Sequence, residues 1–526
     1  MTISLIRPYK LLALALGSLF FSMALPAVAA LPLDQLGSAL GQRIAGTAAP
    51  AALGLSVASA GDFNGDGYPD VLLAAPNAAR GATPGVGQVY VIYGTSVGIP
   101  TVNIATLSAL QGCVISSTGA AASSQIGLSV VGLGDFDGDG IDDIAIGSAI
   151  GDFGATQPGL AWIVRGRNVP AATLDLDTAA GITRLTGNSN GDGFGTVLAA
   201  GGSVNGDARP DLIIGAPYAV DFGGAAYLIY GSSVGPATLA MSALNGSNGT
   251  EITDSVSFDF SGIAVAIGGD VNGDGIGDIV LGAFGIQDSQ QHDVGGAYVI
   301  YGKAGGFGTG SVDLQSLSST AKAKIIGTYY SASGADSAGS AVAFLKDQNG
   351  DGKDEIVVAD PDASPLGRGF AGEVSVIYGA ATLPASMVLS SLNGTTGFRY
   401  EGALAGDKIG SYITTADVSG DGIEDLVMDA QQQVNSTTLG PGKVMVAYGR
   451  AGLPASVDLA ALQAERWNGE IFNAPAGVTN LGAIGGLCAS SCATGRLAIG
   501  AYTEQSSAGA AYIIARPDRI YYDGLD

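Results

Sequence analysis

The feature that most constrains the fold of this chain is an acidic nine-residue pattern that returns along the sequence, each time just before an apolar run. It first appears in "GDFNGDGYPDVLLAAP" and returns in "GDFDGDGIDDIAIGSA", "GDVNGDGIGDIVLGAF" and "KDQNGDGKDEIVVADP". Carboxylates so close together repel one another, and a nearby cation relieves that repulsion. The pattern therefore predicts a structural repeat and, within it, a repeated cation site.

The repeat has a period of about 71 residues, and seven copies account for essentially the whole chain after its first 30 residues. A fixed period of this length is the signature of a repeat architecture, and it leaves no room for a separate catalytic domain. Five copies have an intact acidic loop, and two copies have a weaker one. The first loop position of the seven copies falls at Asp62, Asp135, Ser203, Asp270, Asp347, Asp417 and Cys488.

Each copy contains four short strand candidates bounded by turn residues. A segment such as "LGLSVASA" precedes the acidic loop, an apolar run such as "DVLLAAP" follows it, and a second run such as "GQVYVIYG" comes after a Gly-rich connection. A short piece like "VDLQSL" then leads to one more strand candidate, such as Phe398–Gly402. Four successive short strands favour an antiparallel sheet.

Seven such sheets must bury both faces against neighbours, which predicts an all-β fold. We expect a seven-bladed β-propeller with four antiparallel strands per blade. A linear β-solenoid is the alternative architecture, but it usually has a much shorter repeat. To close the ring, either the segment before the first loop (Leu31–Gly46) or the tail (Arg519–Asp526) must complete a blade.

Residues 1–30 have the features of a secretory signal peptide. Arg7 and Lys10 precede an apolar run, and the segment ends in small residues, which predicts cleavage after Ala29 or Ala30. An uncleaved membrane anchor fits less well because the run is short and is followed by Pro26. We therefore expect residues 31–518 to form the propeller and residues 519–526 a C-terminal tail. The mature chain is predicted to have no membrane span and to reach the periplasm, the cell surface or the medium.

The loop spacing predicts calcium sites. Oxygen ligands at positions one, three, five and nine, with a backbone carbonyl at position seven, suit Ca²⁺, while Mg²⁺ prefers to keep its waters. Gly at position six permits a sharp turn. An EF-hand is excluded because position twelve is an apolar strand residue instead of Glu. Turn chemistry alone could explain one such loop, but not five at a constant offset.

Five intact loops predict about five Ca²⁺ ions and no catalytic residues. The predicted ligands are Asp62, Asn64, Asp66, Tyr68, Asp70; Asp135, Asp137, Asp139, Ile141, Asp143; Asp270, Asn272, Asp274, Ile276, Asp278; Asp347, Asn349, Asp351, Lys353, Glu355; and Asp417, Ser419, Asp421, Ile423, Asp425.

The two weaker copies predict different chemistry. The third loop has Ser203 at position one, so Asn205, Asp207 and Asp211 form at most a weak metal site. In the seventh copy, Cys488 and Cys492 stand near the ligand positions, and an exported protein could pin this turn with a disulfide between them. A zinc site there would need further Cys or His ligands. The third cysteine, Cys113, is expected to be a small buried apolar residue.

These loops, with Phe194-Gly195 and Gly215-Ala216-Pro217 flanking the third, resemble the FG-GAP repeat of integrin α-subunit N-terminal propellers. The resemblance covers about residues 40–516. It implies a seven-bladed propeller, Ca²⁺ held in loops on one face, and a role in adhesion or ligand binding at the cell surface. The chain departs from that family in having five intact loops where three or four are usual, and it lacks an Asp-x-Ser-x-Ser metal motif.

Charge and residue types narrow the function. The net charge is −25, which disfavours binding to nucleic acid or anionic lipid. The only histidine is His292, and no Ser/His/Asp set or Gly-x-Ser-x-Gly motif is present, so we predict that the chain is not an enzyme. The main hypothesis is a secreted calcium-binding adhesion or ligand-binding module whose partner is an unknown protein or glycan.

Two alternatives stay open. One is a hydrolase or lyase acting on a polysaccharide or phosphoester, and the other is a passive structural protein of the envelope. If the chain binds a ligand, variable loops such as Ile286–Val294 and Pro361–Ala371 are expected to supply specificity. The alternative role of any one of these loops is that of a solvated connection.

Overall fold

The computed structural model describes most of the chain. The predicted signal peptide (1–30), the predicted Cys488–Cys492 disulfide and the tail 519–526 lie outside the described residues. The described residues are 31–33, 41–148, 157–168, 171–233, 235–330, 336–431, 433–435, 438–439, 442–462, 469–475, 481, 484–486, 496–504 and 508–515.

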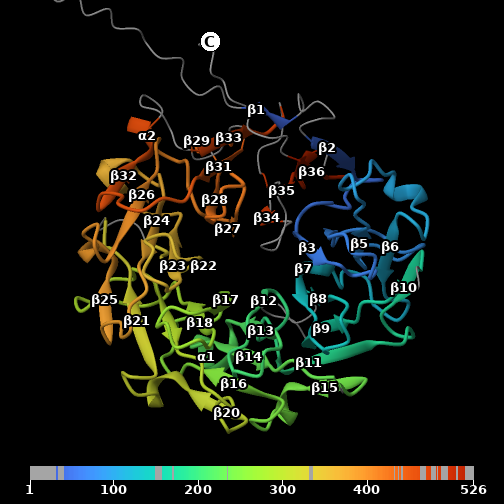
Figure 1. Cartoon of the computed structure of the whole chain (residues 1–526), viewed down its shortest axis with the longest axis horizontal. Helices are drawn as coiled ribbons and strands as arrows, with labels where there is room; N and C mark the ends of the chain where they lie inside the picture. Colours follow the sequence, from blue (N-terminus) through green and yellow to red (C-terminus); the bar gives the residue numbers. More distant parts are fainter. Residues whose placement is uncertain are drawn as a thin grey trace, which may run out of the picture.

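Seven antiparallel sheets are arranged around a central axis, which confirms the predicted all-β propeller (Figure 1). In the first blade the strands are β3 (Val57–Gly61), β4 (Asp70–Ala75), β5 (Gln88–Ile92) and β6 (Gly112–Ser116). They pair in chain order from the centre of the ring outward. The apolar run after each acidic loop is always the second strand, as the repeat pattern predicted.

The other blades repeat this order. Their four antiparallel strands are β7 (Ile126–Gly134), β8 (Asp143–Ser148), β9 (Pro158–Val164) and β11 (Ile182–Asn190) in blade 2; β12 (Leu198–Gly201), β13 (Asp211–Ala216), β14 (Ala225–Ile229) and β16 (Gly249–Thr253) in blade 3; β17 (Ala264–Gly269), β18 (Asp278–Gly282), β19 (Gly296–Ile300) and β21 (Lys322–Ile326) in blade 4; β22 (Ala341–Leu345), β23 (Glu355–Asp360), β24 (Glu373–Ile377) and β26 (Gly397–Glu401) in blade 5; β27 (Ile413–Ala416), β28 (Asp425–Ala430), β31 (Lys443–Ala447) and β33 (Gly469–Asn473) in blade 6; and β34 (Ile484–Gly486), β35 (Arg496–Gly500), β36 (Ala510–Ala515) and β2 (Gly41–Ala45) in blade 7.

Six blades also have a fifth strand, which the sequence analysis did not predict. The piece resembling "VDLQSL" leaves its own copy and pairs in parallel with the outer strand of the preceding blade. Each of these pieces therefore links two neighbouring blades. They are β10 (Thr173–Asp175), β15 (Thr238–Ala240), β20 (Ser311–Asp313), β25 (Ser386–Val388) and β32 (Ser456–Asp458), and β1 (Leu31–Pro32) pairs in the same way with β33.

Within the described residues, helical structure is confined to single turns in the connections. The described turns are η2 (Ile104–Thr106), α1 (Ala219–Phe222), η4 (Met241–Ala243), η5 (Leu314–Ser316), η6 (Pro365–Gly367), η7 (Leu389–Ser391) and α2 (Leu459–Leu462), and a small hairpin joins β29 (Gln433–Asn435) to β30 (Thr438–Leu439).

The ring is closed by the N-terminal segment. Strand β2 is the outer strand of blade 7 and pairs antiparallel with β36, with Gly41 opposite Ile514 and Ala45 opposite Ala510. At the centre, the inner strand of each blade contacts the next around the cycle, and β34 of blade 7 contacts β3 of blade 1 (Figure 1). A linear solenoid has no such closing contact, so that alternative is wrong.

The hydrophobic core lies between the blades. Along β4, Leu72 packs toward blade 2, whereas Leu73 packs toward blade 7. All six residues of β4 are buried for this reason. Continuous apolar runs are typical of strands that are covered on both faces, and here the neighbouring blades provide the cover.

Candidate cation-binding loops

The acidic loops share one face of the propeller. Each connects the first strand of its blade to the second, and the first strands all run in the same direction from the opposite face. In an antiparallel sheet, the loops between strands two and three, and those that lead to the next blade, then lie on the other face. The calcium-type loops and the long variable loops are therefore separated by the thickness of the disc.

The first acidic residue of each loop organises the turn. In blade 4, Asp270 Oδ1 accepts hydrogen bonds from Gly273 N (2.7 Å) and Asp274 N (3.1 Å), and its Oδ2 accepts from Gly275 N (2.8 Å). The bond from the position-six N–H to the position-one carboxylate recurs in all five intact loops at 2.7–3.0 Å. The position-five carboxylate likewise accepts from the N–H at position seven.

Glycine at position six is required by its backbone conformation and not by crowding. Gly275 has φ +84°, in the left-handed region that disfavours a side chain, yet nothing lies within 4 Å of where a Cβ would stand. Gly67, Gly140, Gly352 and Gly422 show the same combination. The prediction that this glycine serves a sharp turn is confirmed.

The position-nine carboxylate is buried and ties the loop to the rest of its blade. Asp278 is fully buried; its Oδ1 accepts from Gly302 N (2.8 Å), and its Oδ2 accepts from Val271 N (2.9 Å). The glycine follows the third strand, so this carboxylate fastens the second strand to the end of the third. The same bond to a glycine N–H is made by Asp70, Asp143, Asp211 and Asp425.

Burial makes these carboxylates hard to ionise in the absence of a cation. Desolvation, with smaller contributions from the neighbouring acids, raises the pKa of Asp70 and Glu355 to about 8. It raises the pKa of Asp143, Asp278 and Asp425 to about 7. One oxygen each of Asp70 and Glu355 is buried without a hydrogen-bond partner.

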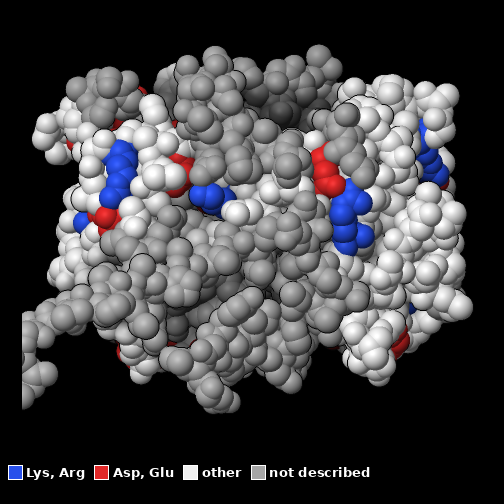
Figure 2. Space-filling model, turned by 90° about the horizontal axis from the view of Figure 1, so that it is seen from above, with Lys and Arg blue, Asp and Glu red and all other residues white. Residues whose placement is uncertain are grey.

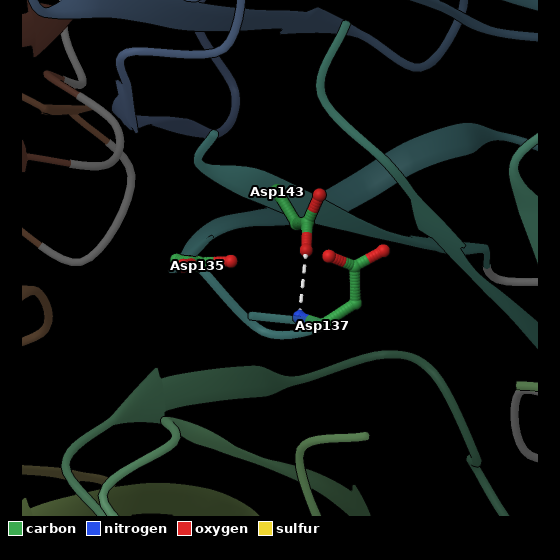
Figure 3. Close-up of side chains that lie close together, drawn as sticks. All are labelled: Asp135, Asp137 and Asp143. Atoms are coloured by element: carbon green, nitrogen blue, oxygen red, sulfur yellow. Dashed lines mark hydrogen bonds between the residues drawn. The ribbon is translucent and has the colours of Figure 1, made fainter. Parts of the chain in front are cut away.

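Loop two brings its carboxylates closest together. Oxygens of Asp135, Asp137 and Asp143 lie within 4.8 Å of one another, the one such trio in the described part of the chain (Figure 3). Asp137 N also donates to Asp143 Oδ2 (3.3 Å). Position three is Asp137 in this loop, where the other intact loops have Asn or Ser, and its Oδ2 lies 2.7 Å from Arg165 Nε, which offsets part of the added negative charge.

The donor set fits a hard cation of calcium size. Converging carboxylates and buried carboxylate oxygens without partners are oxygen ligands of the kind that Ca²⁺ takes. In the five intact loops, the predicted ligands at positions one to seven lie in the turn, and the position-nine carboxylate is the first residue of the second strand. Loop three adopts the same turn without a carboxylate at position one, because Ser203 Oγ accepts from Asp207 N (3.0 Å). Side-chain hydrogen bonds are thus enough to shape the turn, and the carboxylates are in excess of what the turn alone needs.

Acids at position eight were missed by the sequence analysis. Asp142 Oδ2 accepts from Asp62 N (2.7 Å) of the preceding blade, and Asp354 Oδ2 accepts from Asp270 N (2.9 Å) in the same way. Glu424 continues the pattern by accepting from Lys346 N (3.0 Å). These side chains connect neighbouring loops. The sequence does show an acid just before the last ligand in these loops. Its role could not be predicted, because its hydrogen-bond partner lies about one repeat away in the sequence.

A second missed set lies on the opposite face. Buried aspartates occur three residues before a glycine in the connections between blades: Asp192, Asp259, Asp336 and Asp407. Burial raises the pKa of all four. Each accepts at least one hydrogen bond, such as that from Tyr298 OH to Asp259 Oδ2 (2.9 Å). The repeated Asp-x-x-Gly spacing would have found them.

In the view of Figure 2, most of the described surface is uncharged, and several of the basic groups lie beside acidic ones. Cys113 is buried, as predicted, and burial raises the pKa of its thiol to about 12.

Within the described residues, no helix has the length and apolar character needed to cross a membrane.

Comparisons with known proteins agree with this architecture. The FG-GAP repeat family model matches residues 53–92 and 338–377, which cover the first three strands of blades 1 and 5. The chain is 33% identical to bovine (Bos taurus) phosphatidylinositol-glycan-specific phospholipase D over 168 residues, which is 32% of this chain and 19% of that protein.

Integrin α subunits are similar over comparable stretches. Integrin alpha-5 of Xenopus laevis is 32% identical over 169 residues (30% of this chain, 14% of the integrin). Integrin alpha pat-2 of Caenorhabditis elegans is 29% identical over 240 residues (44% and 18%). The matched part spans less than a fifth of each of these relatives. The chain therefore contains FG-GAP repeats, at residues 53–92 and 338–377, and its seven-bladed propeller resembles the N-terminal propeller of integrin α subunits.

Proposed function

We propose that this protein is an exported, calcium-stabilised propeller that binds a ligand at a surface and is not an enzyme. The observation that carries the calcium part is the convergence of Asp135, Asp137 and Asp143 within 4.8 Å. About five ions would lie on one face, one in each intact loop. When bound, Ca²⁺ would keep the loop carboxylates ionised and neutralise their mutual repulsion.

Ligand binding is supported by the face of the disc opposite the acidic loops, which we call the free face. A cavity of about 830 Å³ opens there, among loops of blades 3, 4 and 5. It is lined by Gln287 and Asp293, and by Asp362, which belong to the two variable loops expected to supply specificity. Pockets of this size commonly hold small ligands.

Export is supported by the features of residues 1–30, and adhesion by the similarity to integrin α subunits.

Metal analysis of the mature protein tests the calcium proposal. Protein purified in calcium is expected to retain about five ions per chain and to lose them, with a fall in melting temperature, when a strong calcium chelator is added. Magnesium at the same concentration should restore the melting temperature poorly. A chain that carries no ion and melts unchanged in chelator contradicts the proposal.

A further inference from the structure

The cavity on the free face has an aromatic wall. Phe258 stacks on Phe222, with ring centroids 5.7 Å apart and planes within 6°. Phe260 stacks on Phe284 at 4.8 Å. Phe258 is 61% exposed, although the large apolar ring of a phenylalanine is normally buried. An exposed aromatic face at the mouth of a cavity is typical of a contact surface for a ligand.

The backbone holds these rings at a cost. Phe258 and Phe260 have φ of +68° and +57°, in the left-handed region that non-glycine residues avoid. Phe222 is also left-handed, with φ +52° to +64° across Val220–Phe222. Each such residue costs on the order of 1 kcal/mol, and strain of this kind gathers at functional sites. A strained backbone and an exposed aromatic ring therefore coincide at Phe258.

The polar lining of the cavity consists mainly of oriented acceptors. Asp293 Oδ1 accepts from Gln287 Nε2 (2.8 Å), and Asp362 Oδ2 accepts from Ser337 Oγ (2.8 Å). Asp259 and Asp336, from the buried Asp-x-x-Gly set, complete the acidic lining. Asp293 accepts from one donor and Asp362 also accepts from Lys408 Nζ, and both keep lone pairs for other donors. A ligand that fits must bring hydrogen-bond donors, and a lining rich in acceptors does not suit an anion.

The negative electrostatic potential in the cavity is weaker than four ionised carboxylates would produce. Asp362 also pairs with Lys408 Nζ (2.5 Å), and Lys324 is part of the lining. Asp259 and Asp336 are almost fully buried, and burial raises their pKa values, which favours the neutral acid. A cation would therefore gain little net attraction. The arrangement favours a neutral ligand that has both an apolar face and many hydroxyl donors.

We propose that this cavity binds a neutral carbohydrate of two or three units, with one sugar ring on Phe258 and its hydroxyl groups donating to Asp293 and Asp362. A sugar ring presents an apolar C–H face that suits an aromatic ring, and hydroxyl groups at its rim that suit the carboxylates. The inference rests on the proposed ligand-binding function and names the chemistry of its ligand.

Titration calorimetry with defined probes tests the inference on the mature, calcium-loaded protein. The probes are chitotriose, cellotriose, maltotriose and mannotriose, with choline and argininamide as cationic comparisons. At least one neutral trisaccharide should bind, and F258A should weaken that binding by about tenfold or more. L110A is the matched control, because Leu110 is 84% exposed and lies in a loop on the other face.

The outcomes separate this inference from the proposed function. Circular dichroism should show that F258A and L110A are folded. If no neutral trisaccharide binds, if F258A binds as well as wild type, or if only the cations bind, the inference is overturned. Retention of the protein on intact cells that survives both F258A and periodate oxidation of surface sugars would overturn the carbohydrate inference and leave the ligand-binding function standing. Absence of retention together with absence of sugar binding would remove both.

Discussion

At the scale of single residues, the loop carboxylates have different tasks. The position-one Asp folds the turn through backbone N–H groups, and the position-nine carboxylate ties two strands together from a buried position. Position five has one oxygen engaged by the N–H at position seven. Substitutions at these positions should therefore have different effects. A change at position nine should destabilise the fold directly, and a change at position five should mainly weaken ion binding.

Asp66→Ala should remove about one calcium ion per chain. Asp66 lies in an exposed turn, so the loss should act through the ion, with a destabilisation of up to about 2.7 kcal/mol when calcium is about 100 times Kd. Metal analysis and calorimetry in calcium provide the measurement. Asp207→Ala in the third loop is the matched control and should leave the ion count unchanged. Equal ion content in Asp66→Ala and wild type would contradict the assignment.

Asp429→Asn should change the pH dependence of stability. Asp429 is buried; its Oδ1 accepts from Tyr412 N (2.8 Å), its Oδ2 has no partner, and burial raises its pKa to about 7. An acid whose pKa is raised on folding contributes most stability below its unfolded pKa of about 4 and loses that contribution as pH rises through about 7.

The asparagine keeps the acceptor and removes the charge. At pH 8 the variant should therefore be more stable than wild type by about 1 kcal/mol or more, while at pH 4 the two should be similar. Denaturant unfolding at both pH values, in the same calcium concentration, measures the difference. Asp177→Asn, at an exposed position, is the control and should show no such crossover. A variant less stable than wild type at pH 8 would contradict the role of burial.

At the scale of elements, the second strand of each blade carries the interblade core. Leu73 on β4 is fully buried and packs between blades 7 and 1. Leu73→Ala should cost about 2–5 kcal/mol, because it removes buried methyl groups from a junction that neither blade can close alone. Chemical unfolding measures this cost, and Val97→Ala, at a 93% exposed position, should lie within about 0.5 kcal/mol of wild type.

The strands and turns could largely be predicted from the sequence because their signals are local. An acidic turn followed by an apolar run such as Asp70–Ala75 identifies the second strand wherever it occurs. The parallel strand β25 could not be placed, because Ser386–Val388 pairs with Lys324–Ile326 of the preceding copy, and nothing local specifies that partner. The aromatic wall was missed for the same reason: Phe222, Phe258 and Phe284 come from three separate connections.

At the scale of the whole molecule, the ring depends on its N-terminal segment. Removal of residues 31–45 deletes β1 and β2, which leaves β36 without its outer partner and blade 6 without its parallel strand. The truncated chain should unfold at a lower temperature and aggregate, because blade 7 then exposes an unpaired edge. Removal of 519–526 is the comparison. A larger loss from the tail deletion would show that ring closure depends more on the other terminus.

The position of β1 also bears on the export that we propose for this chain. Leu31 is the first or second residue after the predicted cleavage, which falls after Ala29 or Ala30, and it pairs with a blade built from the C-terminal part of the chain. A chain that crosses a membrane with its N-terminus leading must therefore wait for residues beyond Gly469 before that end finds its partners. If the chain is exported as proposed, the ring can therefore close only when translocation is nearly complete.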